Sequence, residues 1–249
     1  MRIDLQSARS LALGCALLAG MPGITAAQEP PNGDFEAGVL EPWFGSGDIG
    51  VSQDNVLEGA WSGFLTTGPN AVGEVCSYLH SPEVFPPTDQ GRVKVTFKVR
   101  YKTNEGTGPF AFYEDPFHAE FVTVRGALDL LTIKTDGIFW TKGNPTGTSV
   151  IDEATGTKLQ GPPQIPPFGP GVLFGSETPT LSASSEIKLK GCEPVRIKFE
   201  ICDWVDQVVD SAAYVDAVNI SFKEDGKKCP DNQQELFSIE GGQGIPVRQ

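Results

Sequence analysis

The chain has 249 residues, with 32 acidic side chains against 19 basic ones and a formal charge of −13. A balance this acidic argues against nucleic-acid binding and against adhesion to anionic membranes. It fits an exported soluble protein and also a protein that binds divalent cations.

Residues 1–27 have the pattern of a secretory signal peptide. The segment carries Arg2 and Arg9 ahead of the apolar run LALGCALLAG, and Thr25-Ala26-Ala27 forms a small-x-small cleavage signal. No later stretch is long and apolar enough to span a membrane. We therefore expect a secreted, periplasmic or cell-surface-associated protein without membrane insertion.

The mature part opens on the sequence NGDFE at residues 32–36. In an extended chain Asp34 and Glu36 point to one side and Phe35 to the other. Phe35 is expected to anchor the first segment in the core. The two carboxylates would then lie side by side at its surface, where they could bind a cation.

Aromatic residues beside turn residues are candidates for ligand contact. Aromatic faces with polar neighbours can stack on sugar rings, although a β-sandwich also needs aromatics in its core. The tryptophans chosen as possible ligand-stacking residues are Trp43, Trp61 and Trp140.

Strand patterns dominate after the signal peptide, and helical periodicity is almost absent. Residues 92–102, RVKVTFKVRYK, alternate strictly between apolar and polar side chains, and residues 195–204, VRIKFEICDW, repeat the pattern. Such half-buried strands without intervening helices predict an all-β fold, a two-sheet antiparallel jelly-roll sandwich over residues 28–222.

Catalysis has weak support in the sequence. Neither His80 nor His118 lies near a nucleophile pattern such as GxSxG, so both are interpreted as structural. Polysaccharide hydrolysis by paired carboxylates stays open, because the pairing is a distance in space. Its candidate acids near strand ends are Glu105, Glu114, Asp115, Glu120 and Asp136.

Two segments interrupt or follow the strands. Residues 143–180 are rich in Pro and Gly and could form a lid or binding loop, or else a surface insertion with a short hairpin, which we favour. Residues 223–249 are expected to form a polar tail tethered at Cys229.

Four cysteines follow the signal peptide: Cys76, Cys192, Cys202 and Cys229. An even number in an exported chain predicts two disulfides. Three pairings are possible, and the sequence does not choose between them. Our expectation is Cys192–Cys202 with Cys76–Cys229.

The segment DWVDQVVDSAAYVDAVNISF, residues 203–222, ends in a strand with one anomaly. From Tyr214 to Phe222 the even positions carry apolar residues except at Asp216, so alternation predicts an acid on the core-facing side. A buried carboxylate needs compensation.

Two compensations for Asp216 are open. The first and last strands of a sandwich often meet, so Asp34, Glu36 and Asp216 could share a calcium ion. The alternative is a carboxylate that accepts backbone N–H bonds at a strand corner. A second acidic cluster, Asp203, Asp206 and Asp210, could cap a loop or bind a cation itself.

These motifs together resemble a known family. The opening NGDFEAGVLEPWFGSGDIGV resembles the start of bacterial carbohydrate-binding modules with a galactose-binding-like jelly roll. The closing DWVDQVVDSAAYVDAVNISF resembles the end of many secreted or surface-anchored bacterial domains of related architecture. Between them, SYLHSPEV and VKVTFKVRYKTNE resemble two of the family's strands. The resemblance implies a two-sheet jelly roll with a structural calcium at Asp34, Glu36 and Asp216, and it implies no particular sugar-binding residues.

The sequence thus predicts an exported, non-catalytic domain that binds carbohydrate or a cell-surface polymer and is stabilised by calcium and disulfides. The alternatives are a structural, matrix or adhesion protein that makes protein contacts without a sugar site, and a polysaccharide hydrolase. The oligomeric state and the ligand are not specified by the sequence.

Overall fold

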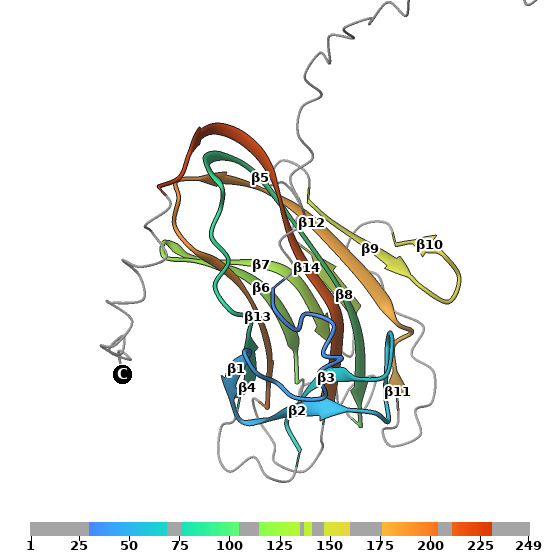
Figure 1. Ribbon diagram of the computed structural model, residues 1–249. Coiled ribbons are helices and arrows are strands. Elements are labelled where there is room, and N and C mark those ends of the chain that lie inside the picture. Colours follow the sequence, from blue (N-terminus) through green and yellow to red (C-terminus); the bar gives the residue numbers. More distant parts are fainter. Residues whose placement is uncertain are drawn as a thin grey trace, which may run out of the picture.

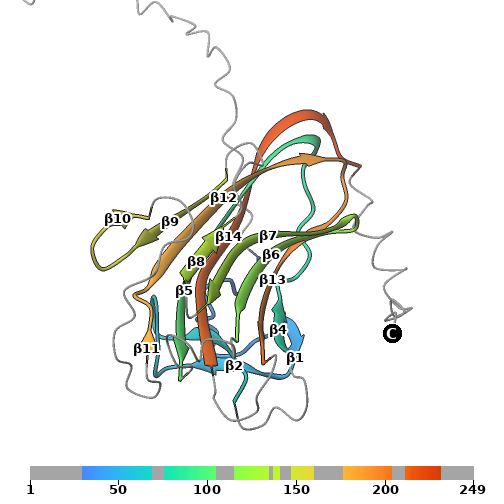
Figure 2. The same cartoon turned by 180° about the vertical axis from the view of Figure 1, so that it is seen from behind.

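The computed structural model describes residues 30–68, 76–104, 115–134, 137–140, 147–159, 176–203 and 211–230. Within these ranges every regular element is a β-strand, and the strands form two antiparallel sheets that pack as a sandwich. Figure 1 and the reverse view in Figure 2 show the two layers. The predicted all-β jelly-roll sandwich is confirmed.

The six-stranded sheet consists, in spatial order, of β1 (Phe44–Ser46), β4 (Cys76–His80), β13 (Val195–Cys202), β6 (Phe117–Thr123), β7 (Gly126–Lys134) and β8 (Gly137–Trp140). The eight-stranded sheet consists of β10 (Thr157–Lys158), β9 (Thr148–Asp152), β12 (Leu181–Lys190), β5 (Thr88–Thr103), β14 (Ser211–Lys228), β3 (Ser62–Thr66) and β2 (Asp48–Ser52), and β11 (Ser176–Glu177) also pairs with β5.

Strand β5 shows why the sequence folds this way. Its apolar alternate residues, from Val93 to Tyr101, are at most 1% exposed and form the inner face of the eight-stranded sheet. Phe199 on β13 packs against them from the opposite sheet, with its ring 5.2 Å from that of Phe97. At one end, β5, β12 and β14 extend as an arch beyond the other strands (Figure 1).

The segment 143–180 contains the hairpin that the sequence favoured. Strands β9 and β10 pair across a turn at residues 153–156, and β9 also pairs with β12. The hairpin therefore extends the eight-stranded sheet at its edge. Residues 160–175 of the segment lie outside the described residues.

The expected disulfide pairing is wrong. The bonds join Cys76 to Cys202 and Cys192 to Cys229. Cys202 ends strand β13 and Cys192 precedes that strand by three residues; the strand alone spans about 23 Å at about 3.3 Å per residue, so the two cysteines lie too far apart to bond. Cys76 and Cys202 instead lie directly opposite each other on β4 and β13.

The chain ends differ in part from the expectation. Strand β14 continues to Lys228, so the sandwich extends past the predicted boundary at residue 223, and Cys229 fastens the chain directly after it. The predicted signal peptide, residues 1–27, lies outside the described residues, as do residues 231–249. Among the residues described, no helix is long and apolar enough to cross a membrane.

Candidate functional site: an acidic pocket and an aromatic hollow on the eight-stranded sheet

A β-bulge in β14 determines which way Asp216 points. Asp216 lies opposite Lys98, but Asn219 lies opposite Thr96, so β14 contains one extra residue between these pairs. Ala217 lies between these pairs and has a positive φ of 48°, as the first residue of some bulge types does. The alternation therefore changes sides within the strand.

The prediction that Tyr214, Asp216, Val218, Ile220 and Phe222 share the inner face is consequently wrong. Val218, Ile220 and Phe222 belong to the core, but Tyr214 and Asp216 do not. These two residues lie opposite the polar residues Arg100 and Lys98, on the outer face of the sheet.

Asp216 is nevertheless 0% exposed, because the chain before β3 covers it. The backbone N–H of Glu58 and the hydroxyl of Ser62 donate to Oδ2 at 3.0 and 2.8 Å, and the N–H of Ala217 donates to Oδ1 at 2.7 Å. This is the hydrogen-bonded compensation that the sequence left open. It satisfies three of the roughly four acceptor positions of a carboxylate.

The segment of residues 30–36 closes over the bulge. The N–H of Val218 donates to the carbonyl of Gly33 at 2.9 Å, so the segment lies against the bulged part of β14. Glu36 accepts the N–H groups of Ala60 and Trp61 on one carboxylate oxygen, at 2.7 and 3.1 Å. The predicted meeting of the two chain ends is present, and Glu36 ties it to the loop before β3.

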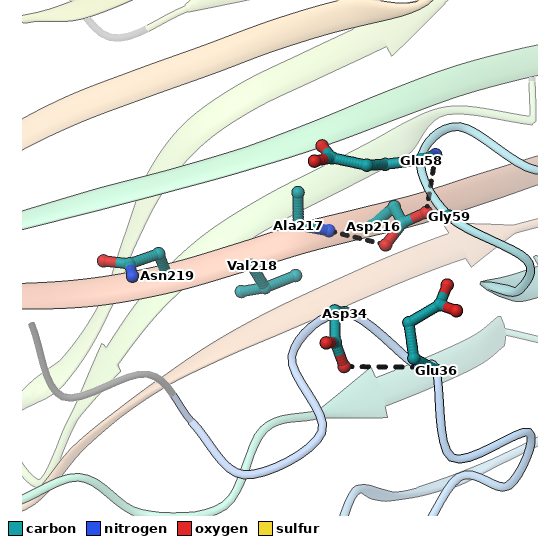
Figure 3. A pocket seen from close by; sticks show the side chains of 8 residues that line it. All are labelled: Asp34, Glu36, Glu58, Gly59, Asp216, Ala217, Val218 and Asn219. Atoms are coloured by element: carbon teal, nitrogen blue, oxygen red, sulfur yellow. Dashed lines mark hydrogen bonds between the residues drawn. The ribbon is translucent and has the colours of Figure 1, made fainter.

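Four carboxylates from these elements line one hollow of about 410 Å³: Asp34, Glu36, Glu58 and Asp216 (Figure 3). Glu58 was not identified from the sequence, because nothing in the chain before β3 shows that it reaches β14. On the rim, Oε2 of Glu58 contacts Nζ of Lys98 at 2.9 Å. The hollow concentrates negative charge, with that lysine as its counter-ion.

The pocket disfavours the ionised form of Asp216. Burial raises the pKa of the Asp216 carboxyl to about 6, and the Glu58 carboxylate adds to the rise. The hydrogen bonds from Ser62, Ala217 and the Glu58 N–H oppose it without cancelling it. The ionised carboxylate is therefore only partly compensated by the protein's own donors.

The pocket suits calcium in the type of its ligands. Calcium prefers six to eight oxygen ligands, and carboxylates, backbone carbonyls and water supply them in exported proteins. The oxygens of Asp34, Glu36 and Asp216 do not all lie within 4.8 Å of one another, so side chains must turn toward an ion to bind it. The one described trio within that distance is Cys76, Glu200 and Cys202, and its cysteines form a disulfide.

An aromatic hollow lies next to the acidic pocket on the same face. Trp61, Phe64 and Tyr214 line it together with residues 51–54, and its volume is about 380 Å³. The rings of Phe64 and Tyr214 are 6.4 Å apart, and Nζ of Lys102 lies 5.7 Å from the centre of the Tyr214 ring. Gln53 and Asp54 are exposed at its edge.

The three tryptophans proposed for ligand contact lie in different environments. Trp61 lines the hollow. Trp43 is only 4% exposed, lies between Phe35 and Phe199, and donates its indole N–H to the carbonyl of Pro31, so its proposed role in ligand stacking is wrong. Trp140 lies on β8 opposite Leu131, and its side chain lies outside the described part.

The other acidic candidates do not form a site in the described residues. Asp203 is buried, whereas Asp206 and Asp210 lie outside the description. Of the acids considered for hydrolysis, Glu120 pairs with Lys198 at 3.1 Å, and Asp115 accepts a hydrogen bond from Thr67 at 2.8 Å. Glu105, Glu114 and Asp136 lie outside the described residues.

Comparison with known proteins gives structural neighbours only. No family model matches the chain, and no curated protein matches its sequence. The K1 cleaved adhesin domain of Lys-gingipain from Porphyromonas gingivalis W83 is similar at 14% identity and a TM-score of 0.40, over 78% of this chain and 96% of that one.

Two further neighbours are similar at 9% identity. A family 16 carbohydrate-binding module has a TM-score of 0.35, over 76% of this chain and 96% of that one. The enzymatically active domain of tailspike protein 4 from bacteriophage CBA120 has a TM-score of 0.38, over 77% of this chain, which spans 21% of that domain.

Proposed function

We propose that this protein is an exported, non-catalytic domain that binds carbohydrate or a cell-surface polymer through the aromatic hollow. The observation that supports the proposal is the meeting of Trp61, Phe64 and Tyr214 with the exposed polar groups of Gln53 and Asp54. Apolar ring faces bordered by a few polar groups suit a sugar ring, which has apolar C–H faces and a polar rim.

We further propose that calcium completes the acidic pocket. Asp34, Glu36 and Asp216 would hold the ion, and Glu58 is a further ligand candidate. The raised pKa of Asp216 supports this, since a nearby cation favours the ionised carboxylate. Glu36 also holds the N–H of Trp61, so an ion at Glu36 would order the loop that carries part of the hollow.

The alternatives have less support. A protein-contact surface would expose a contiguous apolar patch. The large exposed apolar side chains among the described residues are Val39, Phe44, Val124 and Ile151, which lie on different segments of the chain. Lys198 forms ion pairs with both Glu120 and Glu200, which gives that carboxylate pair a structural role.

The proposal is tested by measuring binding of the mature protein to a panel of immobilised neutral polysaccharides. Phe64→Ala removes a wall of the hollow and should weaken binding about tenfold or more, as truncation of a central aromatic contact typically does. Phe44→Ala is the matched control, because Phe44 is 47% exposed on β1 of the other sheet.

The control variant should bind as the wild type does. Equal losses in both variants, or unchanged binding by Phe64→Ala, would place the ligand elsewhere and reject the hollow. A wild type that binds no polysaccharide would reject the proposed function itself.

A further inference from the structure

Positive charge is concentrated at the arched end of the eight-stranded sheet, on a chain that is otherwise acidic. Lys188 on β12, Arg92 on β5 and Lys223 on β14 lie directly opposite one another in one row across the three strands. Together with Lys190 and Asp225 they line a hollow of about 560 Å³. Figure 1 shows these strand ends in the arch.

This row is unfavourable for folding. Like charges directly opposite each other on neighbouring strands destabilise a sheet. Arg92 has an acidic partner, because its guanidinium contacts Glu186 at 2.6 Å. Lys188, Lys190 and Lys223, by contrast, have no carboxylate within 4.0 Å in the described part of the chain.

Cations on the central strand β5 of the same sheet do have acidic partners. Nζ of Lys98 contacts Glu58 at 2.9 Å, and Nζ of Lys102 contacts Glu177 at 2.9 Å. The chain's excess of carboxylates could have supplied partners for the arch lysines as well, and among the described residues it relieves the repulsion in the row only at Arg92. Positions that break a local rule without structural compensation are where functional sites are expected.

We infer that the arch binds an acidic polysaccharide, whose carboxylate or sulfate groups would pair with Lys188, Arg92 and Lys223. Charge-assisted hydrogen bonds from ammonium and guanidinium groups to such anions are strong, and the anions would relieve the repulsion along the row. The inference rests on the proposed carbohydrate binding for its class of ligand, but it concerns a separate site.

The test compares polygalacturonate with its fully methyl-esterified form, which has the same backbone without the charge. The wild type should bind polygalacturonate more tightly, and the difference should shrink as salt rises from about 50 mM to about 500 mM. Lys188→Gln and Lys223→Gln should each weaken polygalacturonate binding at least about fivefold. Lys158→Gln, an equal charge change on the exposed strand β10, should not.

A stability measurement separates a binding role from a structural one. Because each variant removes a like-charge contact, Lys188→Gln and Lys223→Gln should unfold at the wild-type temperature or above it. Lower unfolding temperatures in both would show that the lysines stabilise the fold, which contradicts the inference.

The remaining outcomes distinguish this inference from the proposed function. Binding of neutral polysaccharides that depends on Phe64, with no preference for polygalacturonate over its ester, overturns the arch site alone. No binding of any polysaccharide overturns both. Equal affinity for a single-stranded DNA of the same charge overturns the assignment to polysaccharide.

Discussion

Asp216 combines complete burial, three hydrogen bonds and three neighbouring acids. Its donors are two backbone N–H groups and a serine hydroxyl, all neutral. Neutral donors compensate a carboxylate less well than a cation does. Asp34, Glu36 and Glu58 line the same hollow and add negative charge. Hydrogen bonds thus hold the Asp216 side chain in place, and a cation in the pocket would further compensate its negative charge.

The pKa of Asp216 predicts how stability depends on pH in the presence of a chelator. A carboxyl whose pKa is raised to about 6 in the folded state holds its proton more tightly there than in the unfolded state. The contribution of this carboxyl to the free energy of unfolding is greatest at low pH and is lost as pH rises from about 4 to about 6. The loss should approach about 3 kcal/mol in the free energy of unfolding.

The measurement is denaturant unfolding of the wild type and of Asp216→Asn across that range. The amide side chain of the variant does not titrate, so the wild type should lose stability relative to the variant as pH rises. His80 acts in the opposite direction, because burial, with Arg196 and Lys198, lowers its pKa to about 4. Its contribution is lost as pH falls, but it is common to both proteins and cancels. Parallel pH profiles would contradict the raised pKa.

At the scale of the element, the bulge in β14 makes the site possible. Without the extra residue at Ala217, Asp216 could not lie on the outer face while Val218 and Ile220 remain in the core. The positive φ of 48° at Ala217 is a strained conformation for a residue with a side chain. The strand therefore stores strain at the point where the segment of residues 30–36 contacts it.

The strain predicts an unusual effect of glycine. Ala217→Gly should raise the free energy of unfolding by up to about 1 kcal/mol or leave it unchanged, because glycine adopts positive φ without strain. Ala213→Gly, in the regular part of the same strand and fully buried, should instead lower it by about 1 kcal/mol. Thermal unfolding of both variants gives the comparison. A larger loss in Ala217→Gly than in Ala213→Gly would mean that the bulge is not at this residue.

The sequence predicted the sandwich but not the bulge, for a physical reason. Strict alternation in 92–102 specifies one buried face, so β5 could be predicted. In β14 apolar residues stand at odd-numbered and at even-numbered positions around Asp216. Val215 faces the core before the bulge, and Val218 faces the core after it. The sequence pattern alone does not show at which residue the inward-facing side chains switch from odd-numbered to even-numbered positions.

Contacts between distant segments were predictable only in part. The meeting of Asp34 and Glu36 with Asp216 followed from the tendency of terminal strands to meet. Glu58 did not follow, because its position depends on how the chain before β3 folds back. The disulfides depend on strand order, which places Cys76 beside Cys202 although 126 residues separate them.

For the whole molecule, calcium should stabilise the native state. At about a hundred times its dissociation constant, an ion that binds only the folded protein adds roughly 2.7 kcal/mol, seen as a rise of several degrees in the unfolding temperature. Asp216→Asn should lose most of this rise. Asp152→Asn should keep it, because Asp152 is equally an acid with hydrogen bonds, to Ala154 and Thr155, but lies in the hairpin. An equal rise in all three proteins would place the ion elsewhere.

The central claim is that the acidic pocket and the aromatic hollow form one functional face, linked through Glu36 and the N–H of Trp61. It is tested most directly by calorimetric titration of the mature protein with the best-bound neutral polysaccharide, in calcium and then in chelator. We expect tighter binding in calcium, and little binding in either condition after Phe64→Ala. Affinity that is the same with and without calcium, or that survives the loss of Phe64, would contradict it.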